Sequence, residues 1–239
     1  MTPEHHSVAA GQKAADDSYY EHPREEIAAL VPPGARCIVD VGCGAGALGK
    51  HLKESRPGVQ VRGVEIVPEE AERAGRVLDD VAGTDAQNGM PAHWPEPDCV
   101  VFADVLEHLT DPWAVLRQWR RHLAPGGSLV VSLPNIAHRS VVAGLVRGRW
   151  EYGPYGILDR MHLRFFTRWS AVEMIESSGY KVRRLLRVFD VMPTTPARDK
   201  FRDYLDHVAR SEPIVHDRRG PSIILADLCT TQFLIVAGG

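Results

Sequence analysis

Short apolar runs alternate with amphipathic segments along most of the chain, and these two patterns predict strands and helices in turn. The apolar runs predict strands at residues 37–41, 59–66, 98–103, 128–133, 180–188 and 232–236. Apolar positions at helical spacing predict helices over residues 19–30, 47–55, 68–78, 112–123 and 167–178. Such alternation is typical of an α/β fold with a doubly wound parallel sheet.

Two long segments, residues 134–166 and 191–222, interrupt this alternation. Connections of this length in a compact fold usually carry function, so we expect both to be insertions that face the substrate. Residues 1–17 are polar and are predicted to form a flexible N-terminal arm. Residues 18–239 are then expected to form a single domain.

Composition limits the kinds of partner. The chain has 239 residues, 44% of them hydrophobic, and a net charge of −3, which provides no basic field for nucleic acid. The four cysteines form no CxxC pair, and no apolar run approaches the roughly 18 residues of a membrane span. We therefore expect a cytoplasmic protein that binds neither nucleic acid nor membrane.

The candidate chemistry begins at the glycine-rich turn after the first predicted strand. Gly42, Gly44 and Gly46 follow Asp40 and lead directly into a predicted helix. Glycines allow the backbone to turn tightly and a ligand to approach it closely. The turn alone also matches a relaxed dinucleotide-binding fingerprint, which is typical of Rossmann dehydrogenases.

Acidic residues around the turn change the expected ligand. Asp40 would repel a pyrophosphate but suits a ligand that carries an ammonium or sulfonium group. Glu65 closes the second predicted strand, where a carboxylate accepts hydrogen bonds from ribose hydroxyls. Asp85 either accepts from an adenine amino group or caps a turn. An adenosine with positive charge and no phosphate fits S-adenosylmethionine.

Three motifs then occur in a characteristic order, at residues 39–46 (VDVGCGAG), 102–109 (FADVLEHL) and 123–127 (LAPGG). From about residue 19 to 188 the chain resembles class I S-adenosylmethionine-dependent methyltransferases. Residues 132–135 and 159–167 resemble the branch of ubiquinone-biosynthesis, sugar and natural-product methyltransferases. The resemblance implies a Rossmann-like sheet, mostly parallel, with the last strand antiparallel.

The resemblance also implies contacts to the cofactor, which leaves as S-adenosylhomocysteine. Arg24 matches an arginine near the methionine carboxylate, Gly42 the turn glycine, Glu65 the ribose carboxylate and Ala103 a backbone position. Tyr20 either closes over the cofactor or anchors the first helix. We expect the complete cofactor-binding set to be Tyr20, Arg24, Asp40, Gly42, Cys43, Gly44, Glu65, Ile66, Asp85, Ala86, Ala103 and Asp104.

His162 is the candidate catalytic base, because an imidazole near neutrality can take a proton from a hydroxyl or an ammonium. The alternative is that it only holds the loop backbone. Aromatic side chains of the first insertion either line a substrate pocket or form a small core. The expected substrate-binding residues are His108, His138, Trp150, Tyr152, Tyr155 and Phe166.

Asp104, Glu107 and His108 form a D-x-x-E-H set. In related methyltransferases similar sets hold a divalent metal, and His138 or His162 could complete such a site. The alternative, that Glu107 and His108 only fix the loop and helix at the mouth of the active site, is favoured. No metal is therefore expected.

The sequence thus predicts methyl transfer from S-adenosylmethionine to an oxygen or nitrogen of a small metabolite, either a sugar or a natural-product intermediate. One alternative is C-methylation of an electron-rich aromatic ring; another is a catalytically silent binding subunit. Methylation of an RNA end would need a basic groove, against which the net charge argues. A homo-oligomer is compatible with the pattern.

Overall fold

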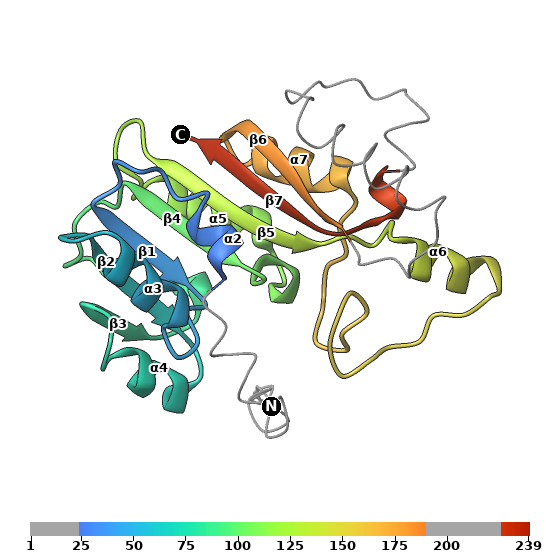
Figure 1. The fold of residues 1–239 in the computed structure, drawn as a ribbon, viewed down its shortest axis with the longest axis horizontal. Helices are drawn as coiled ribbons and strands as arrows, with labels where there is room; N and C mark the ends of the chain where they lie inside the picture. Colours follow the sequence, from blue (N-terminus) through green and yellow to red (C-terminus); the bar gives the residue numbers. More distant parts are fainter. Residues whose placement is uncertain (1–23, 190–225) are drawn as a thin grey trace, which may run out of the picture.

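The computed structural model describes residues 24–189 and 226–239. The predictions for the arm at 1–17, for Tyr20 and for the insertion at 191–222 lie outside the described residues. One seven-stranded sheet forms the centre of the described part, with helices on both of its faces (Figure 1).

The strand order is β3-β2-β1-β4-β5-β7-β6. Neighbouring strands from β3 to β5 pair in parallel, whereas β7 runs antiparallel to both β5 and β6. This topology confirms the predicted doubly wound sheet with an antiparallel last strand. The strands are β1 (Cys37–Val41), β2 (Gln60–Glu65), β3 (Asp80–Gly83), β4 (Cys99–Ala103), β5 (Ser128–Pro134), β6 (Lys181–Phe189) and β7 (Thr230–Gly238).

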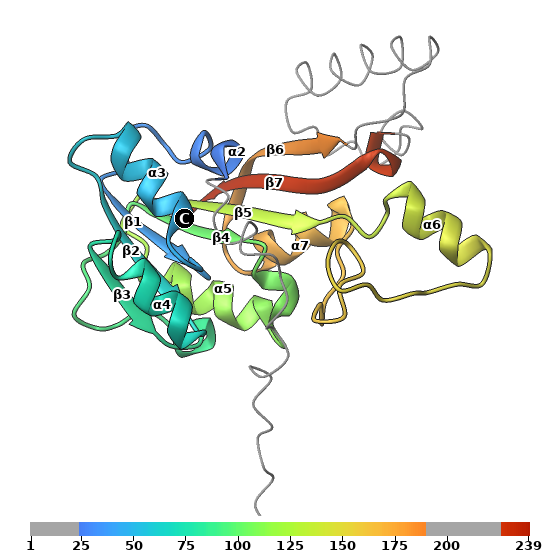
Figure 2. The same ribbon diagram turned by 60° about the horizontal axis from the view of Figure 1, so that its bottom comes forward.

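The helices are short and alternate with the strands. They are α2 (Glu25–Ala28), α3 (Ala47–Ser55), α4 (Pro68–Ala74), α5 (Pro112–Arg120), α6 (Arg139–Val146) and α7 (Arg168–Ser177), with the 3-10 turns η2 (Ala86–Asn88) and η3 (Leu106–His108). Helices α2 and α3 pack on one face of the sheet, and α5 and α7 on the other (Figure 2). Because both faces are covered, the central strands β4 and β5 are mostly apolar and are buried along nearly their whole length.

Local chemistry explains where the helices begin. The Asp111 side chain accepts a hydrogen bond from the Ala114 amide (2.9 Å), and Pro112 takes the first position of α5. Thr167 and Ser170 form a capping box at the start of α7. The predicted ends were less accurate: α4 stops at Ala74, and α5 stops at Arg120.

Two elements differ from the prediction in kind or extent. Helix α6 lies inside the first predicted insertion, for which no helix was expected. Strand β7 covers Thr230–Gly238 rather than residues 232–236, because it pairs along its length with both β5 and β6. The sheet therefore continues further toward the first insertion than the apolar run alone indicated.

Strands β1, β2 and β4 are parallel, so their C-terminal ends share one edge of the sheet, here called the carboxyl edge. The glycine turn follows β1, Glu65 is the last residue of β2, and η3 begins shortly after β4. In doubly wound sheets, ligands bind at this edge.

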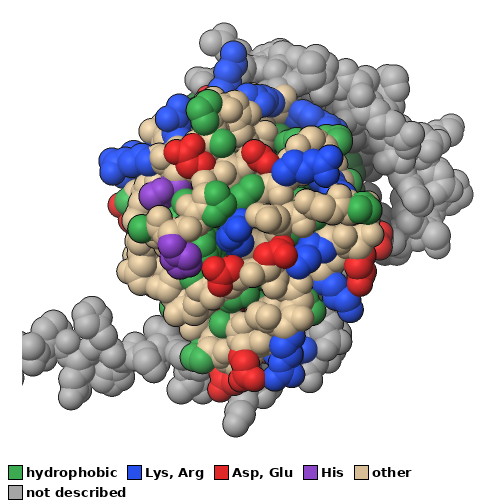
Figure 3. Space-filling view, turned by 90° about the vertical axis from the view of Figure 1, so that its left-hand side faces the viewer, with side chains coloured by type: hydrophobic (Ala, Val, Ile, Leu, Met, Phe, Trp, Pro, Cys, Tyr) green, Lys and Arg blue, Asp and Glu red, His purple; other side chains and the backbone are tan. Residues whose placement is uncertain are grey.

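The opposite end of the molecule, at the left of Figure 1, carries Lys and Arg side chains interspersed with Asp and Glu (Figure 3). Charges of both signs therefore share that face. Among residues 24–189 and 226–239, no helix combines the length and apolar character that crossing a bilayer requires.

Candidate cofactor and acceptor site

The glycine turn after β1 has a backbone that only glycine adopts readily. Gly42, Gly44 and Gly46 have φ values of 74°, 51° and 84°. The Gly42 amide donates to the Val64 carbonyl (2.7 Å), which holds the turn against the end of β2. A Cβ at Gly42 would lie 2.4 Å from Cγ2 of Val105, so no larger residue fits without movement.

Glu65 connects the end of β2 to this turn. Its carboxylate accepts hydrogen bonds from the amides of Gly44 (2.8 Å) and Val67 (2.9 Å), and the residue is buried. Burial raises the pKa of Glu65, although these backbone donors oppose the shift. A carboxylate has about four acceptor sites, so acceptor capacity remains for the hydroxyls of a ligand.

Asp40 places a second buried carboxylate at the carboxyl edge, with only 2% of the residue exposed. Burial, and then the charge of Glu65, raise the pKa of Asp40 to about 7. Two anionic groups in a region shielded from water favour a cation there.

Arg24 and Asp104 form an ion pair beside this edge, with Nη1 of Arg24 2.5 Å from Oδ2 of Asp104. Both residues adopt left-handed backbone conformations, with φ values of 47° and 56°. The Ser132 hydroxyl donates to Oδ1 of Asp104 (2.8 Å), and the Gln232 amide donates to the same oxygen. Strands β5 and β7 thus fix the orientation of Asp104.

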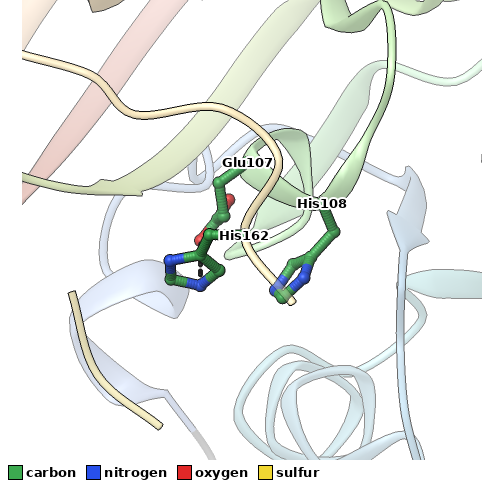
Figure 4. A group of neighbouring side chains, drawn as sticks. All are labelled: Glu107, His108 and His162. Carbon is green, nitrogen blue, oxygen red and sulfur yellow. Dashed lines mark ion pairs between the residues drawn. The ribbon is translucent and has the colours of Figure 1, made fainter. Parts of the chain in front are cut away.

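Glu107, His108 and His162, here called the Glu–His cluster, lie at the same carboxyl edge. Glu107 and His108 belong to η3, and His162 comes from the loop before α7, which lies against η3 (Figure 4). Their side chains point toward one another, with Nε2 of His162 4.0 Å from Oε1 of Glu107. The two imidazole rings are 4.7 Å apart between centroids.

The first insertion presents aromatic side chains. Trp150 packs edge-on against Phe165, with centroids 5.2 Å apart, and against Tyr152 at 6.1 Å. The His162 and Phe165 ring centroids are 6.3 Å apart, which joins this aromatic group to the Glu–His cluster. Tyr155 is 80% exposed and adds to the open surface.

A family model described as a methyltransferase domain matches residues 15–185. The chain belongs to this methyltransferase family. Relatives include the ubiquinone biosynthesis O-methyltransferase of Cereibacter sphaeroides (strain ATCC 17029 / ATH 2.4.9), which is 30% identical over 163 residues. That alignment spans 64% of each protein, so just under two thirds of the relative's length is matched.

Solved methyltransferase structures share the fold. A SAM-dependent methyltransferase from Archaeoglobus fulgidus superposes with a TM-score of 0.59 at 16% identity, covering 93% of this chain and 94% of that one. The cyclase SpnF superposes with a TM-score of 0.56 at 18% identity, covering 90% and 79%. Identity at this level shows the fold alone, since the fold also supports other chemistry.

The family match and the shared fold are those of class I methyltransferases, whose cofactor is S-adenosylmethionine. The carboxyl edge fits this cofactor in two respects. The tight turn requires glycine at Gly42, because a Cβ there would meet the Val105 side chain at a positive φ. The buried carboxylates of Asp40 and Glu65 suit a cationic group and ribose hydroxyls, respectively.

The structure brings most of the proposed cofactor residues of this methyltransferase to the carboxyl edge. Cys43 is buried, and its sulfur packs against the Gly63 backbone, so its side chain is structural. Ile66 is 62% exposed beside Glu65, where an apolar ligand surface could cover it. The residues at or next to the edge are Arg24, Asp40, Gly42, Cys43, Gly44, Glu65, Ile66, Ala103 and Asp104.

Asp85 and Ala86, which follow β3, make hydrogen bonds within the protein. Asp85 accepts a hydrogen bond from the Gln87 amide (2.8 Å) and so caps η2, which was one of its two predicted roles. The Ala86 carbonyl accepts a hydrogen bond from Nε1 of Trp119 (3.0 Å). Adenine contact by these residues stays a prediction.

Two predicted substrate residues require revision. Phe166 is only 2% exposed and packs in the main core near Trp113, so it does not face an acceptor; its neighbour Phe165 joins the aromatic group instead. The side chains of successive residues in extended backbone point to opposite sides, which explains why Phe165 and not Phe166 lies in the aromatic group. His138 is buried and caps α6 through Ser140, and these contacts are those of a helix cap.

Ser132 and Gln232 were missed as site residues, although they position Asp104. A polar residue inside the apolar strand 128–133 was the available signal for Ser132. For Gln232 the sequence offered no comparable signal, because β7 meets the site only through the sheet topology.

Proposed function

We propose that this methyltransferase transfers the methyl group of S-adenosylmethionine to an oxygen or nitrogen of a small molecule, a sugar or natural-product intermediate. The observation that carries the proposal is the intact carboxyl edge, where Asp40, Glu65 and the glycine turn meet the requirements of the cofactor. The Cereibacter sphaeroides relative is a ubiquinone biosynthesis O-methyltransferase, which supports oxygen as the acceptor atom.

Bound S-adenosylmethionine supplies a methyl group already activated by its sulfonium. The protein's own task is therefore to align the acceptor and remove water from it. Glu65 orders the glycine turn through the Gly44 amide, and the ion pair between Arg24 and Asp104 fixes the backbone directly after β4. The exposed rings of Trp150 and Tyr152 provide an apolar surface for the acceptor.

His162 as the catalytic base remains a prediction. Its Nδ1 faces the Ile157 carbonyl (3.1 Å), so Nε2 is the atom that can accept a proton. The ring is 8% exposed, and Nε2 faces Glu107. A lone pair that is bound to a cation cannot accept a proton, so Nε2 acts as a base only while it has no other partner.

The proposal is tested by incubating the protein with deuterium-labelled S-adenosylmethionine and a panel of sugar nucleotides, phenols and amines. Mass spectrometry should show one labelled methyl group on a panel member, and nuclear magnetic resonance should place it on oxygen or nitrogen. A label found only on ring carbon would instead support C-methylation, which the group formed by Trp150, Tyr152 and Phe165 favours as the second candidate.

A catalytically silent binding subunit would give a third result. It would bind S-adenosylhomocysteine but label no acceptor in the panel. The Glu65→Ala variant provides the control, because it removes the carboxylate without removing the aromatic surface. Labelling that persists unchanged in this variant would contradict the assignment of the cofactor site.

A further inference from the structure

The Glu–His cluster is assembled from two distant parts of the sequence. The amides of Leu163 and Arg164 donate to the Glu107 carbonyl (2.8 and 3.0 Å), which holds the loop containing His162 against η3. One potential ligand atom from each of Glu107, His108 and His162 lies within 4.8 Å of the other two. Backbone hydrogen bonds therefore fix the loop that contains His162 against η3.

The Glu107 carboxylate has no role in holding this loop. Glu107 is 1% exposed, and neither of its carboxylate oxygens has a hydrogen-bond partner within the part of the chain that the structure describes. Burial, and then the charge of Asp104, raise its pKa well above the ordinary range. A buried carboxylate without partners is costly, so such a group in a folded protein requires an explanation.

The two histidines are oriented so that each keeps one lone pair. His108 Nδ1 lies 3.2 Å from the Met161 carbonyl, and His162 Nδ1 lies 3.1 Å from the Ile157 carbonyl. A carbonyl only accepts, so each Nδ1 donates its hydrogen and each Nε2 carries the lone pair. Imidazoles that ligate metals are held in this way by backbone carbonyls.

Asp104 does not belong to the cluster, in contrast to the D-x-x-E-H set indicated by the sequence. Its two carboxylate oxygens are already engaged by Arg24, Ser132 and Gln232. Of the two histidines considered as additional ligands, His138 caps α6, whereas His162 faces Glu107. The structure thus selects a different three-residue set from the one that the motif suggested.

We propose that Glu107, His108 and His162 bind one divalent transition-metal ion through a carboxylate oxygen and two imidazole nitrogens. This donor set suits Zn²⁺, Mn²⁺, Co²⁺ or Fe²⁺, and three protein ligands leave coordination positions open. His108 is exposed, so the open side of the site faces solvent at the carboxyl edge. A bound cation would compensate the buried Glu107 carboxylate, which accepts no hydrogen bond from residues 24–189 or 226–239.

Metal binding is measured on the purified full-length chain after treatment with a chelator and dialysis. Titration calorimetry with Zn²⁺ alone and Mn²⁺ alone, without any methyl acceptor, should show one saturable site per chain. Mn²⁺ binding is checked independently by electron paramagnetic resonance. We expect Glu107→Gln and His162→Ala each to lower the affinity by at least about tenfold.

Matched controls separate this site from adventitious binding. His93 is an exposed histidine beside Asp80, so His93→Ala should leave the affinity and stoichiometry unchanged. Glu107→Gln keeps the shape of the side chain, so it remains informative if His162→Ala fails to fold. Zn²⁺ should raise the melting temperature of the wild type and not that of Glu107→Gln.

The proposal is overturned if the wild type shows no one-to-one site, or if Glu107→Gln binds both ions as tightly as the wild type. Affinity for S-adenosylhomocysteine, measured in the same samples, keeps this failure distinct from failure of the proposed function. A chain that binds S-adenosylhomocysteine and no metal refutes the metal site alone.

Discussion

Asp40 allows the sharpest test of the cofactor assignment, because its buried charge has opposite effects on stability and on binding. Asp40→Asn keeps the size of the side chain and removes the ionisable proton. In the ligand-free protein the pKa of Asp40 is raised from the ordinary 3.8 to about 7, chiefly by burial. The folded state therefore holds this proton over a range in which the unfolded chain has released it.

The direction of the pH effect follows from proton linkage. Between about pH 4 and pH 7 the unfolded state binds fewer protons at Asp40, so this group lowers stability as the pH rises. At about 1.4 kcal/mol per pH unit, the full penalty is on the order of 4 kcal/mol above pH 7. Asp40→Asn should therefore be more stable than the wild type at about pH 8, with the difference becoming small near pH 4.

Binding should change in the opposite direction. Loss of the Asp40 charge should weaken S-adenosylhomocysteine binding by about 1–3 kcal/mol, since the ligand carries an ammonium group. Methylthioadenosine lacks that ammonium and should bind both proteins alike. Urea unfolding across the pH range and titration calorimetry with both ligands provide the measurements.

A matched control is Glu54→Gln on α3. Glu54 is exposed and forms a surface ion pair with Lys50 (4.0 Å), so its loss should change neither stability nor binding appreciably. The reasoning about buried charge fails if Asp40→Asn has wild-type stability at about pH 8 and also binds S-adenosylhomocysteine with wild-type affinity.

Three further substitutions test neighbouring parts of the site. Gly42→Ala places a Cβ 2.4 Å from Val105 at a φ of 74°, so it should lower the melting temperature and S-adenosylhomocysteine affinity; Val105→Ala in the same chain should restore part of both. Glu65→Ala leaves the amides of Gly44 and Val67 without an acceptor and should cost about 1–3 kcal/mol in urea unfolding, with weaker calorimetric binding; unchanged binding would contradict its ribose role. Trp150→Ala should raise KM for the acceptor identified by the labelling panel and leave S-adenosylhomocysteine affinity unchanged, whereas an unchanged KM would remove Trp150 from the acceptor surface.

The local sequence pattern was sufficient to predict the central strands of the sheet and the glycine turn. Strands β1 and β4 are buried on both faces, so their apolar runs are unambiguous. The start of α5 could be predicted because Asp111 and Pro112 encode it directly. Helix α6 was missed because it buries only Val141, and Leu145 and Val146 are exposed, which leaves no apolar periodicity to detect.

Contacts between segments that are distant in the sequence could not be predicted from local patterns. Asp104 is held by Arg24, Ser132 and Gln232, which are 80, 28 and 128 residues away in the chain. Their meeting depends on the strand order, which no local pattern specifies. For the same reason the D-x-x-E-H motif could not specify the neighbours of Glu107: Asp104 pairs with Arg24, whereas His162, from a loop far along the chain, lies beside Glu107.

Asp40 and Glu107 present the same physical problem at two points of the carboxyl edge. Each is a buried carboxylate whose pKa is raised chiefly by desolvation, and each weakens the folded state when ionised. The proposed function accounts for Asp40, since S-adenosylmethionine bound at this edge would bring a cation to it. A carboxylate binds a cation strongly when it is poorly solvated in the ligand-free protein. The same poor solvation lowers the stability of the folded state, so burial of the carboxylate causes both effects. The same reasoning applies to Glu107, which also needs a cation nearby when it is ionised. Because the neighbours of Glu107 are two histidines and not a glycine turn, a metal ion fits this position better than an organic cation.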